Sequence, residues 1–183
     1  MFDMAISTQN TRIQRFLVAA LVAGALLVGA LPALAASEVG TASGLPVPRY
    51  VSLKSDRVNV RAGPTKDHDV AWVFTRSGLP VEITAEFENW RRIRDWEGAE
   101  GWVYHSLLSG RRTAVVVLRS KDELVPLSAS PETTGSVTAK LQSGVVASVR
   151  RCNGAWCRIS GDGFEGWIPQ ERLWGVYPNE KID

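Results

Sequence analysis

The side chains that most often carry out nucleophilic or metal chemistry are scarce in this chain of 183 residues. The two histidines are His68 and His105, and the two cysteines are Cys152 and Cys157. A cysteine–histidine pair would have to join distant segments, and the sequence has no nucleophile elbow, glycine-rich phosphate loop, HExxH or CxxC motif. We therefore expect a protein that is not an enzyme and that uses no cofactor.

A structural disulfide explains the two cysteines better than catalysis does. They flank residues 153–156 in the stretch RRCNGAWCR. If these four residues form a hairpin loop, Cys152 and Cys157 lie directly opposite each other, with Cα atoms about 4.5–5.5 Å apart, which a disulfide tolerates. A two-residue turn at Asn153 and Gly154 would instead offset the cysteines and strain the bridge. Free thiols are the other alternative, and two thiolates are too few ligands for a metal site.

The elements that would position these side chains are short strands. From residue 51 onward, apolar residues occur in short runs, broken about every 8 to 12 residues by Gly, Pro, Asp or Asn. Examples are RVNVRAGP, DVAWVFTRSG and LPVEITAEFEN. These runs are rich in β-branched and aromatic residues and are too short for helices. They predict an all-β fold.

The N-terminus predicts export. Arg12 and Arg15 precede the apolar run FLVAALVAGALLVGALPALA, which ends in the small-residue pattern of a secretory signal peptide. Cleavage near Ala35 would remove residues 1–35 and leave no stable membrane span. The alternative is an uncleaved anchor, since about 20 apolar residues can span a bilayer. We expect cleavage, and a periplasmic or secreted protein whose residues 36–49, rich in Ser, Gly, Thr and Pro, form a flexible linker.

The rest of the chain repeats itself. The stretch EGAEGWVYHSLLSG is echoed by DGFEGWIPQERLWG near the C-terminus, and the echo extends upstream at an offset of 65 to 67 residues. Matched positions include Trp90 with Trp156, Ile93 with Ile159, residues 101–103 with residues 166–168, and Leu107 with Leu173. The chain is therefore a tandem repeat of a β unit of about 60 residues, a size at which a single domain has a modest core.

Each unit resembles a bacterial SH3 (SH3b) domain. The first carries RVNVRAGP, then ENWRRIR and AEGWVYHSLL; the second keeps GAWCRIS and EGWIPQERL but opens with the divergent LVPLSASPE. The resemblance implies two small SH3-like β-barrels side by side, over residues 50–112 and 113–183. The link at residues 109–121 contains neither Pro nor a Gly/Ser run. We expect a strand at residues 113–118 and an interface between the barrels.

The same comparison singles out candidate ligand-binding residues in the first unit. Its opening keeps Asn59 and Arg61, where the second unit has Pro126 and Ser128. Several of its aromatic residues have no aromatic counterpart in the second unit, and loops on small rigid scaffolds often carry function. The candidates are Asn59, Arg61, Trp72, Phe74, Trp90 and Tyr104.

SH3b-like domains commonly bind peptidoglycan, or peptides and proteins outside the cytoplasm. The resemblance thus implies a non-catalytic binding module of the cell envelope, with peptidoglycan or an envelope protein or peptide as partner. A structural or assembly role in a periplasmic or membrane-associated complex is the alternative. Lys and Arg number 21 against 19 Asp and Glu, with the signs interleaved, so no nucleic-acid partner is expected.

Overall fold

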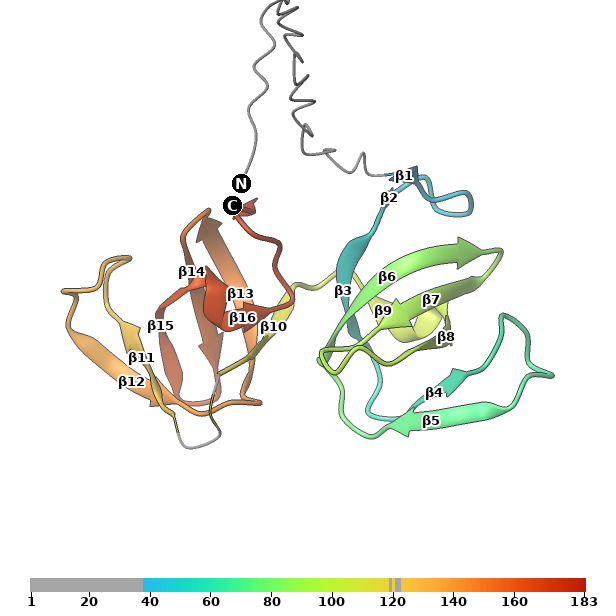
Figure 1. Ribbon diagram of the computed structural model, residues 1–183, viewed down its shortest axis with the longest axis horizontal. Coiled ribbons are helices and arrows are strands. Elements are labelled where there is room, and N and C mark those ends of the chain that lie inside the picture. The colour runs from blue at the N-terminus through green and yellow to red at the C-terminus, as the bar shows by residue number, and fades with distance from the viewer. Residues whose placement is uncertain (1–37, 119, 121–122) are drawn as a thin grey trace, which may run out of the picture. The chain divides into compact units, whose positions relative to one another are not determined.

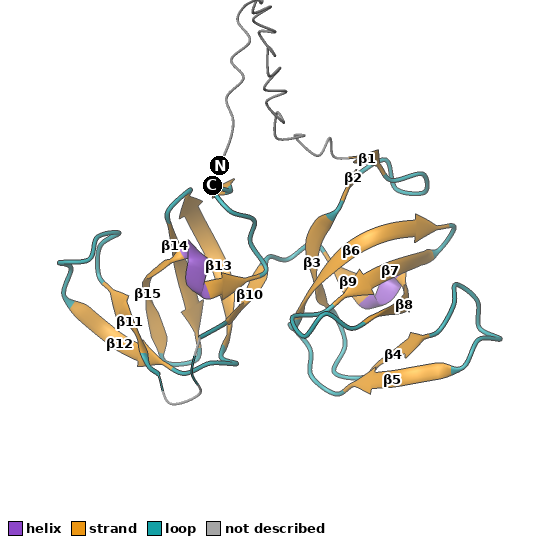
Figure 2. Cartoon of the chain, viewed as in Figure 1, coloured by secondary structure: helices purple, strands orange, loops and turns teal. Residues whose placement is uncertain are grey.

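The computed structural model describes residues 38–118, 120 and 123–183 (Figure 1). The expected signal peptide, residues 1–35, lies outside this range. The described chain is almost entirely β-structure, with two short 3-10 helices, η1 (His105–Leu107) and η2 (Gln170–Arg172) (Figure 2). None of its helices has the length and apolar character needed to cross a membrane.

The first barrel is an antiparallel sheet with the strand order β5-β4-β8-β7-β6-β3-β9. Alternation along β4 decides which side chains face inward: Val58 and Val60 are fully buried, whereas Asn59 is exposed. The strands are β3 (Arg49–Leu53), β4 (Val58–Arg61), β5 (Val70–Phe74), β6 (Pro80–Phe87), β7 (Trp90–Arg94), β8 (Glu100–Tyr104) and β9 (Leu108–Ser109).

The second barrel repeats this topology in the order β12-β11-β15-β14-β13-β10-β16, and β17 pairs with β13. The expected all-β fold of two tandem small barrels is confirmed. The strands are β10 (Thr113–Val116), β11 (Val125–Ser128), β12 (Val137–Leu141), β13 (Val146–Asn153), β14 (Trp156–Gly161), β15 (Phe164–Pro169), β16 (Leu173–Trp174) and β17 (Lys181–Ile182).

The correspondence extends to irregularities in the pairing. A register shift after Val60 in β4 recurs after Leu127 in β11. One difference from the sequence alignment lies after the 3-10 helices. There Leu173 corresponds to Leu108, not Leu107, because both leucines pair with the first strand of their barrel. The sequence alignment was therefore off by one residue at this point.

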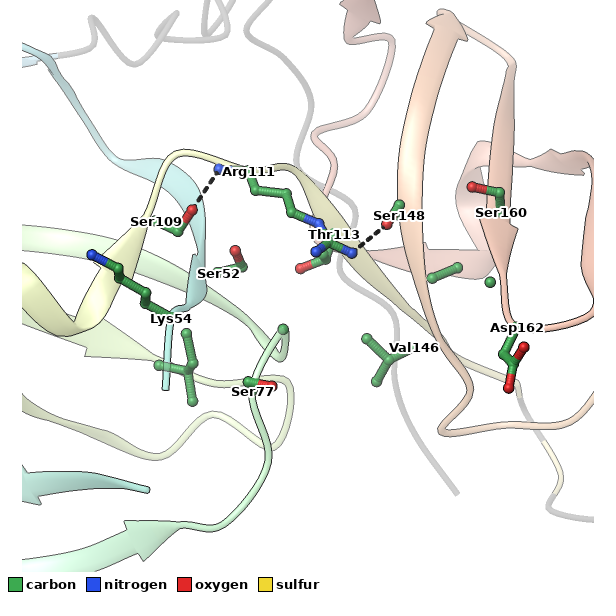
Figure 3. Close-up of a pocket in the computed structure, with 14 residues that line it drawn as sticks. Ser52, Lys54, Ser77, Ser109, Arg111, Thr113, Val146, Ser148, Ser160 and Asp162 are labelled. Carbon is green, nitrogen blue, oxygen red and sulfur yellow. Dashed lines mark hydrogen bonds between the residues drawn. The ribbon is translucent and has the colours of Figure 1, made fainter. Parts of the chain in front are cut away.

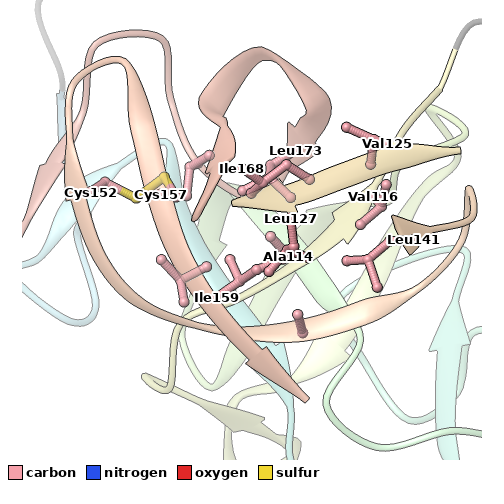
Figure 4. Close-up of a cluster of buried hydrophobic side chains, with 13 residues drawn as sticks. Ala114, Val116, Val125, Leu127, Leu141, Cys152, Cys157, Ile159, Ile168 and Leu173 are labelled. Atoms are coloured by element: carbon pink, nitrogen blue, oxygen red, sulfur yellow. A yellow bond between two sulfur atoms is a disulfide. The ribbon is translucent and has the colours of Figure 1, made fainter. Parts of the chain in front are cut away.

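Each barrel closes around its own hydrophobic core. In the first, Val58, Val60, Val81, Ile93 and Val103 are fully buried. Figure 4 shows the second, in which Ala114, Leu127, Ile159 and Ile168 meet beside the disulfide. Because inward-facing residues come from nearly every strand, each core holds the strand ends, and hence the loops between them, in fixed positions.

The predicted disulfide is present. Cys152 and Cys157 are direct partners on β13 and β14, with Cα atoms 4.1 Å apart and an S–S distance of 2.01 Å. The Asn153 side chain accepts hydrogen bonds from the backbone N–H groups of Ala155 and Trp156, which closes the loop. The pairing of β13 with β14 ends at Cys152 and Cys157, so the cysteines lie directly opposite each other as expected, and the alternative turn that would offset them is wrong.

Residues 36–37 of the expected flexible linker lie outside the described residues, and over residues 38–49 the structure differs from that expectation. There β1 (Glu38–Val39) and β2 (Pro46–Val47) form a hairpin. The carboxylate of Glu86 explains why this polar segment is held: it accepts hydrogen bonds from the backbone N–H groups of Ala42 and Ser43, from the Ser43 hydroxyl and from Arg49. Burial alone would raise the pKa of Glu86, but these hydrogen bonds outweigh it and lower the pKa to about 2.

The two barrels contact each other within the unit Ala36–Asp183. The Tyr50 ring lies 5.0 Å from that of Trp174 and 4.6 Å from that of Tyr177, measured between centroids. The Tyr177 hydroxyl donates to a Glu82 carboxylate oxygen at 2.9 Å. Burial, followed by this hydrogen bond, raises the pKa of Tyr177 above its usual value. The expected strand at residues 113–118 forms as β10, two residues shorter, and the expected interface is present.

Candidate functional site

Four of the six candidate residues meet in one depression on the first barrel. It has a volume of about 170 Å³, and we call it the first groove. Strand β4 contributes its exposed side to the groove. One aromatic wall is Trp90, the first residue of β7, and the other is Tyr104, the last residue of β8. The groove is lined by Asn59, Arg61, Lys66, Trp90, Tyr104 and Leu107.

The two aromatic walls are set by strand register. Trp90 and Tyr104 are direct partners across β7 and β8. Their rings meet edge to face, with centroids 5.4 Å apart and planes at 85°, an arrangement that aromatic quadrupoles favour. Trp90 is 8% exposed, so the barrel holds most of its indole and presents only part of it to the groove.

Arg61 has two roles in this region. Its guanidinium donates to the backbone carbonyl of His68 at 2.6 Å, which ties down the loop between β4 and β5. The same side chain lines the groove beside Lys66. Gly63 lets the loop close, because a Cβ there would collide with the His68 ring. The loop therefore presents Lys66 from a braced backbone.

The remaining two candidates lie elsewhere. Trp72 and Phe74 pack on each other from β5, with ring centroids 6.2 Å apart. Phe74 is 8% exposed and belongs to the core, and Trp72 packs against that core and lies close to Gly101. Neither lines the first groove. The sequence alone could not distinguish a packing role from a binding role for these two residues, because β5 carries apolar residues on both faces.

The second barrel carries a larger depression at the corresponding place, with a volume of about 700 Å³. We call it the second groove. Trp156 and Pro169 are direct partners on β14 and β15 and replace Trp90 and Tyr104. The groove is lined by Thr133, Gly154, Ala155, Trp156, Pro169, Gln170, Glu171, Leu173, Val176, Pro178 and Asn179.

The C-terminal segment forms one wall of the second groove. Gln170 donates through its side-chain amide to the backbone carbonyls of Tyr177 and Glu180. Arg112 holds Glu180 through hydrogen bonds at 2.7 and 3.0 Å. Burial opposes the ionisation of Glu180, but the bonds from Arg112 and the Tyr177 backbone outweigh it and lower the pKa. This wall could not be predicted from the sequence, where its only signal is the terminal stretch LWGVYPNE.

The two grooves differ in charge as well as size. The first carries Arg61 and Lys66 and no acidic residue, whereas the second carries Glu171 and no basic residue. Within the described ranges, no three His, Cys, Asp or Glu side chains are grouped so that they could hold a metal ion. The chemistry available in the first groove is aromatic contact, amide hydrogen bonding and attraction for a negative charge.

Several solved structures resemble this chain at low similarity. NlpC2 and NlpC1 from Trichomonas vaginalis are 13% and 14% identical, each with a TM-score of 0.31, and they cover 69% and 74% of this chain. This chain covers 48% of each, about half their length. The endolysin LysPBC5 CBD is 19% identical, with a TM-score of 0.29, and the alignment covers 69% of this chain and 91% of that one. No curated protein matches the sequence.

The sequence profile of the bacterial SH3 domain matches twice, over residues 54–110 and 121–175. The first match contains β4 to β9 and the second contains β11 to β16. In each barrel the first strand, β3 or β10, precedes the matched segment. The two matches together cover more than half of the chain, which therefore belongs to the bacterial SH3 domain family and carries two tandem copies of the domain.

Proposed function

We propose that this protein is a non-catalytic binding module of the cell envelope that recognises peptidoglycan through the first groove. The observation that carries the proposal is the convergence of Asn59, Arg61, Trp90 and Tyr104 on one depression from three strands. Bacterial SH3 domains are typically binding modules. The disulfide is consistent with an oxidising compartment such as the periplasm or the cell exterior.

The lining of the first groove suits a peptide that ends in, or carries, a carboxylate. Trp90 and Tyr104 offer rigid apolar surface at a small entropic cost. The Asn59 amide can both donate to and accept from a peptide backbone. Lys66 and Arg61 lie at the same groove with no acidic residue to neutralise them. The peptides of peptidoglycan carry free carboxylates, which these two cations attract.

An assembly role is the second candidate, and one observation favours it. The N-terminal hairpin exposes apolar side chains, with Val39 68% and Leu45 52% exposed, and Phe87 at the end of β6 is 48% exposed. Exposed apolar residues gathered in one region often mark protein contacts. In this account the hairpin, rather than the first groove, would meet the partner, which is an envelope protein.

Sedimentation with purified sacculi tests the first candidate. The wild-type protein is expected to sediment with the sacculi, and Lys66→Gln and Tyr104→Ala to remain in solution. Lys140→Gln is the matched charge control, because Lys140 is exposed on β12 of the other barrel. Circular dichroism verifies that each variant is folded.

The controls also separate the two candidates. Equal sedimentation of folded Lys66→Gln, Tyr104→Ala and wild type would refute the groove assignment. No sedimentation of the wild type, together with recovery of an envelope protein that Val39→Ser no longer captures, would favour the assembly role.

A further inference from the structure

A polar cavity, separate from both grooves, lies where the two barrels meet (Figure 3). It has a volume of about 440 Å³, and we call it the junction pocket. Hydroxyl groups dominate its lining, because six of the residues around it are serine or threonine. Lys54, Arg111 and Asp162 are its charged residues.

The chain connecting the barrels builds one side of this pocket. The backbone N–H of Arg111 donates to the Ser109 hydroxyl at 3.2 Å, and its guanidinium donates to the Ser148 hydroxyl at 2.7 Å. Figure 3 shows Arg111 extended across the pocket between the two barrels by these bonds. A guanidinium has five N–H donors. One bond to Ser148 therefore leaves Arg111 with donors for a bound group.

Thr113 gives an independent sign that the pocket binds something. The residue is 2% exposed, and its side-chain oxygen has no hydrogen-bond partner within the described residues. Leaving a buried hydroxyl without a hydrogen-bond partner destabilises a fold. Its neighbour across β10 and β13 is Ser148, which itself lines the pocket. A bound polar molecule would supply the missing partner.

We propose that the junction pocket binds an acidic sugar, that is, a saccharide carrying a carboxylate. Hydroxyl side chains both donate and accept, as the hydroxyls of a sugar ring require. Lys54 and Arg111 outnumber the single carboxylate of Asp162, which favours an anion. The described lining contains no aromatic side chain and few apolar ones, so it does not suit an apolar peptide side chain.

The size of the pocket agrees with this class of ligand. A volume of about 440 Å³ lies in the lower half of the range for small-molecule sites, and it has room for a single sugar ring with its substituents. N-acetylmuramic acid, whose carboxylate is free where cell-wall glycan carries no peptide, and the uronic acids of other polysaccharides both have the required chemistry. The site goes beyond the proposed groove function and does not depend on it.

Binding of soluble sugars to the full chain tests this proposal by NMR titration. N-acetylmuramic acid is expected to shift the amide signals of Thr113 and Ser148. N-acetylglucosamine has a similar ring without the carboxylate. We expect its affinity to be lower by a factor of about ten or more, the usual effect of losing a charged hydrogen bond. Equal binding of the two sugars, or shifts confined to the grooves, would overturn the proposal.

Three variants sharpen the test. Thr113→Val is expected to weaken binding about threefold to tenfold while leaving the melting temperature unchanged or higher, since it removes a hydroxyl that has no partner. Arg111→Gln is expected to weaken binding about tenfold or more, and Asp162→Asn to strengthen it. Arg158→Gln, on an exposed ion pair with Glu165, is the control and is expected to have no effect. Unchanged affinity in Thr113→Val and Arg111→Gln would contradict the site.

Glucuronic acid distinguishes the two sources of acidic sugar. Binding of glucuronic and N-acetylmuramic acid with similar affinity supports the pocket as a general acidic-sugar site. Binding of N-acetylmuramic acid alone supports it as a site for cell-wall glycan from which the peptides have been removed. If neither sugar binds, the proposal is wrong, and the groove assignment is tested separately by sedimentation.

Discussion

In the first barrel, Glu86 and Arg91 face each other across the β6–β7 hairpin as an ion pair, at 3.3 Å. In the second barrel, Cys152 and Cys157 hold the corresponding positions of the β13–β14 hairpin as a disulfide. The same position of the hairpin is thus cross-linked by an ion pair in the first barrel and by a disulfide in the second. The ion pair has an additional structural role, because its Glu86 carboxylate also accepts hydrogen bonds from the N-terminal hairpin.

The grooves beside these hairpins differ in a similar way. The first groove is small, cationic and walled by two aromatic rings. The second is larger, because Pro169 replaces Tyr104 and the C-terminal segment adds a wall. The backbone scaffold is common to both, so the difference in chemistry comes from side chains and from the chain ends. The two copies of the domain therefore offer different surfaces to a ligand.

The largest expected effect tests whether the two scaffolds are equivalent. Ile93 and Ile159 occupy matching positions and are both fully buried. We expect Ile93→Ala and Ile159→Ala each to lower the free energy of unfolding by about 2–5 kcal/mol, by similar amounts. Chemical denaturation measures both. Val70→Ala and Val137→Ala are controls at matching exposed positions and are expected to change little. A large loss in one barrel alone would break the comparison.

Acid is expected to weaken the first barrel through Glu86. Its pKa is lowered to about 2, so the carboxylate stabilises the fold above its unfolded-state value near 4.5, and this stability is lost as the pH falls toward 2. The contribution at pH 7 is about 3 kcal/mol at most. Glu86→Gln is expected to lower the free energy of unfolding at pH 7 and to flatten its pH dependence.

The acid effect has a surface control. Glu165 pairs with Arg158 at 3.0 Å, and both side chains are about half exposed. Glu165→Gln is therefore expected to change the free energy of unfolding by less than about 1 kcal/mol. If Glu86→Gln were as stable as Glu165→Gln across the pH range 2 to 7, the account of the N-terminal hairpin would be wrong.

Reduction is expected to act on the second barrel, with a smaller effect. The bridge closes a short loop, so its loss costs about 2 kcal/mol. Hydrogen exchange should become faster in β13 and β14 under reductant and stay unchanged in β6 and β7. Faster exchange in both hairpins would show that the barrels do not respond separately.

The strands and the disulfide could be predicted from sequence because their signals are local. Short runs of β-branched and aromatic residues predicted the strands, and the spacing of Cys152 and Cys157 around a turn favoured the disulfide. The N-terminal hairpin was missed because its anchor, Glu86, lies 43 residues from Ser43 along the chain. Phe74 lies in the core rather than at the first groove, and its burial could not be predicted for the same reason: it depends on packing partners such as Trp96 that come from a distant strand end.

The second groove could not be predicted for a related reason. Its wall depends on Gln170, Arg112 and Glu180, which meet only when the C-terminal segment folds back. No periodic pattern marks such contacts. Four of the candidates chosen from sequence nevertheless lie together at the first groove. Their role in binding remains a prediction.

The most direct test of the central claim is an NMR titration with a soluble peptidoglycan fragment that retains its peptide. The indole N–H signals of Trp90 and Trp156 report on the first and second groove, respectively. We predict that the Trp90 signal shifts in a saturable way while the Trp156 signal stays in place, and that Lys66→Gln weakens the response. A saturable shift of Trp156 alone, or no shift of either signal, would contradict the assignment of peptidoglycan binding to the first groove.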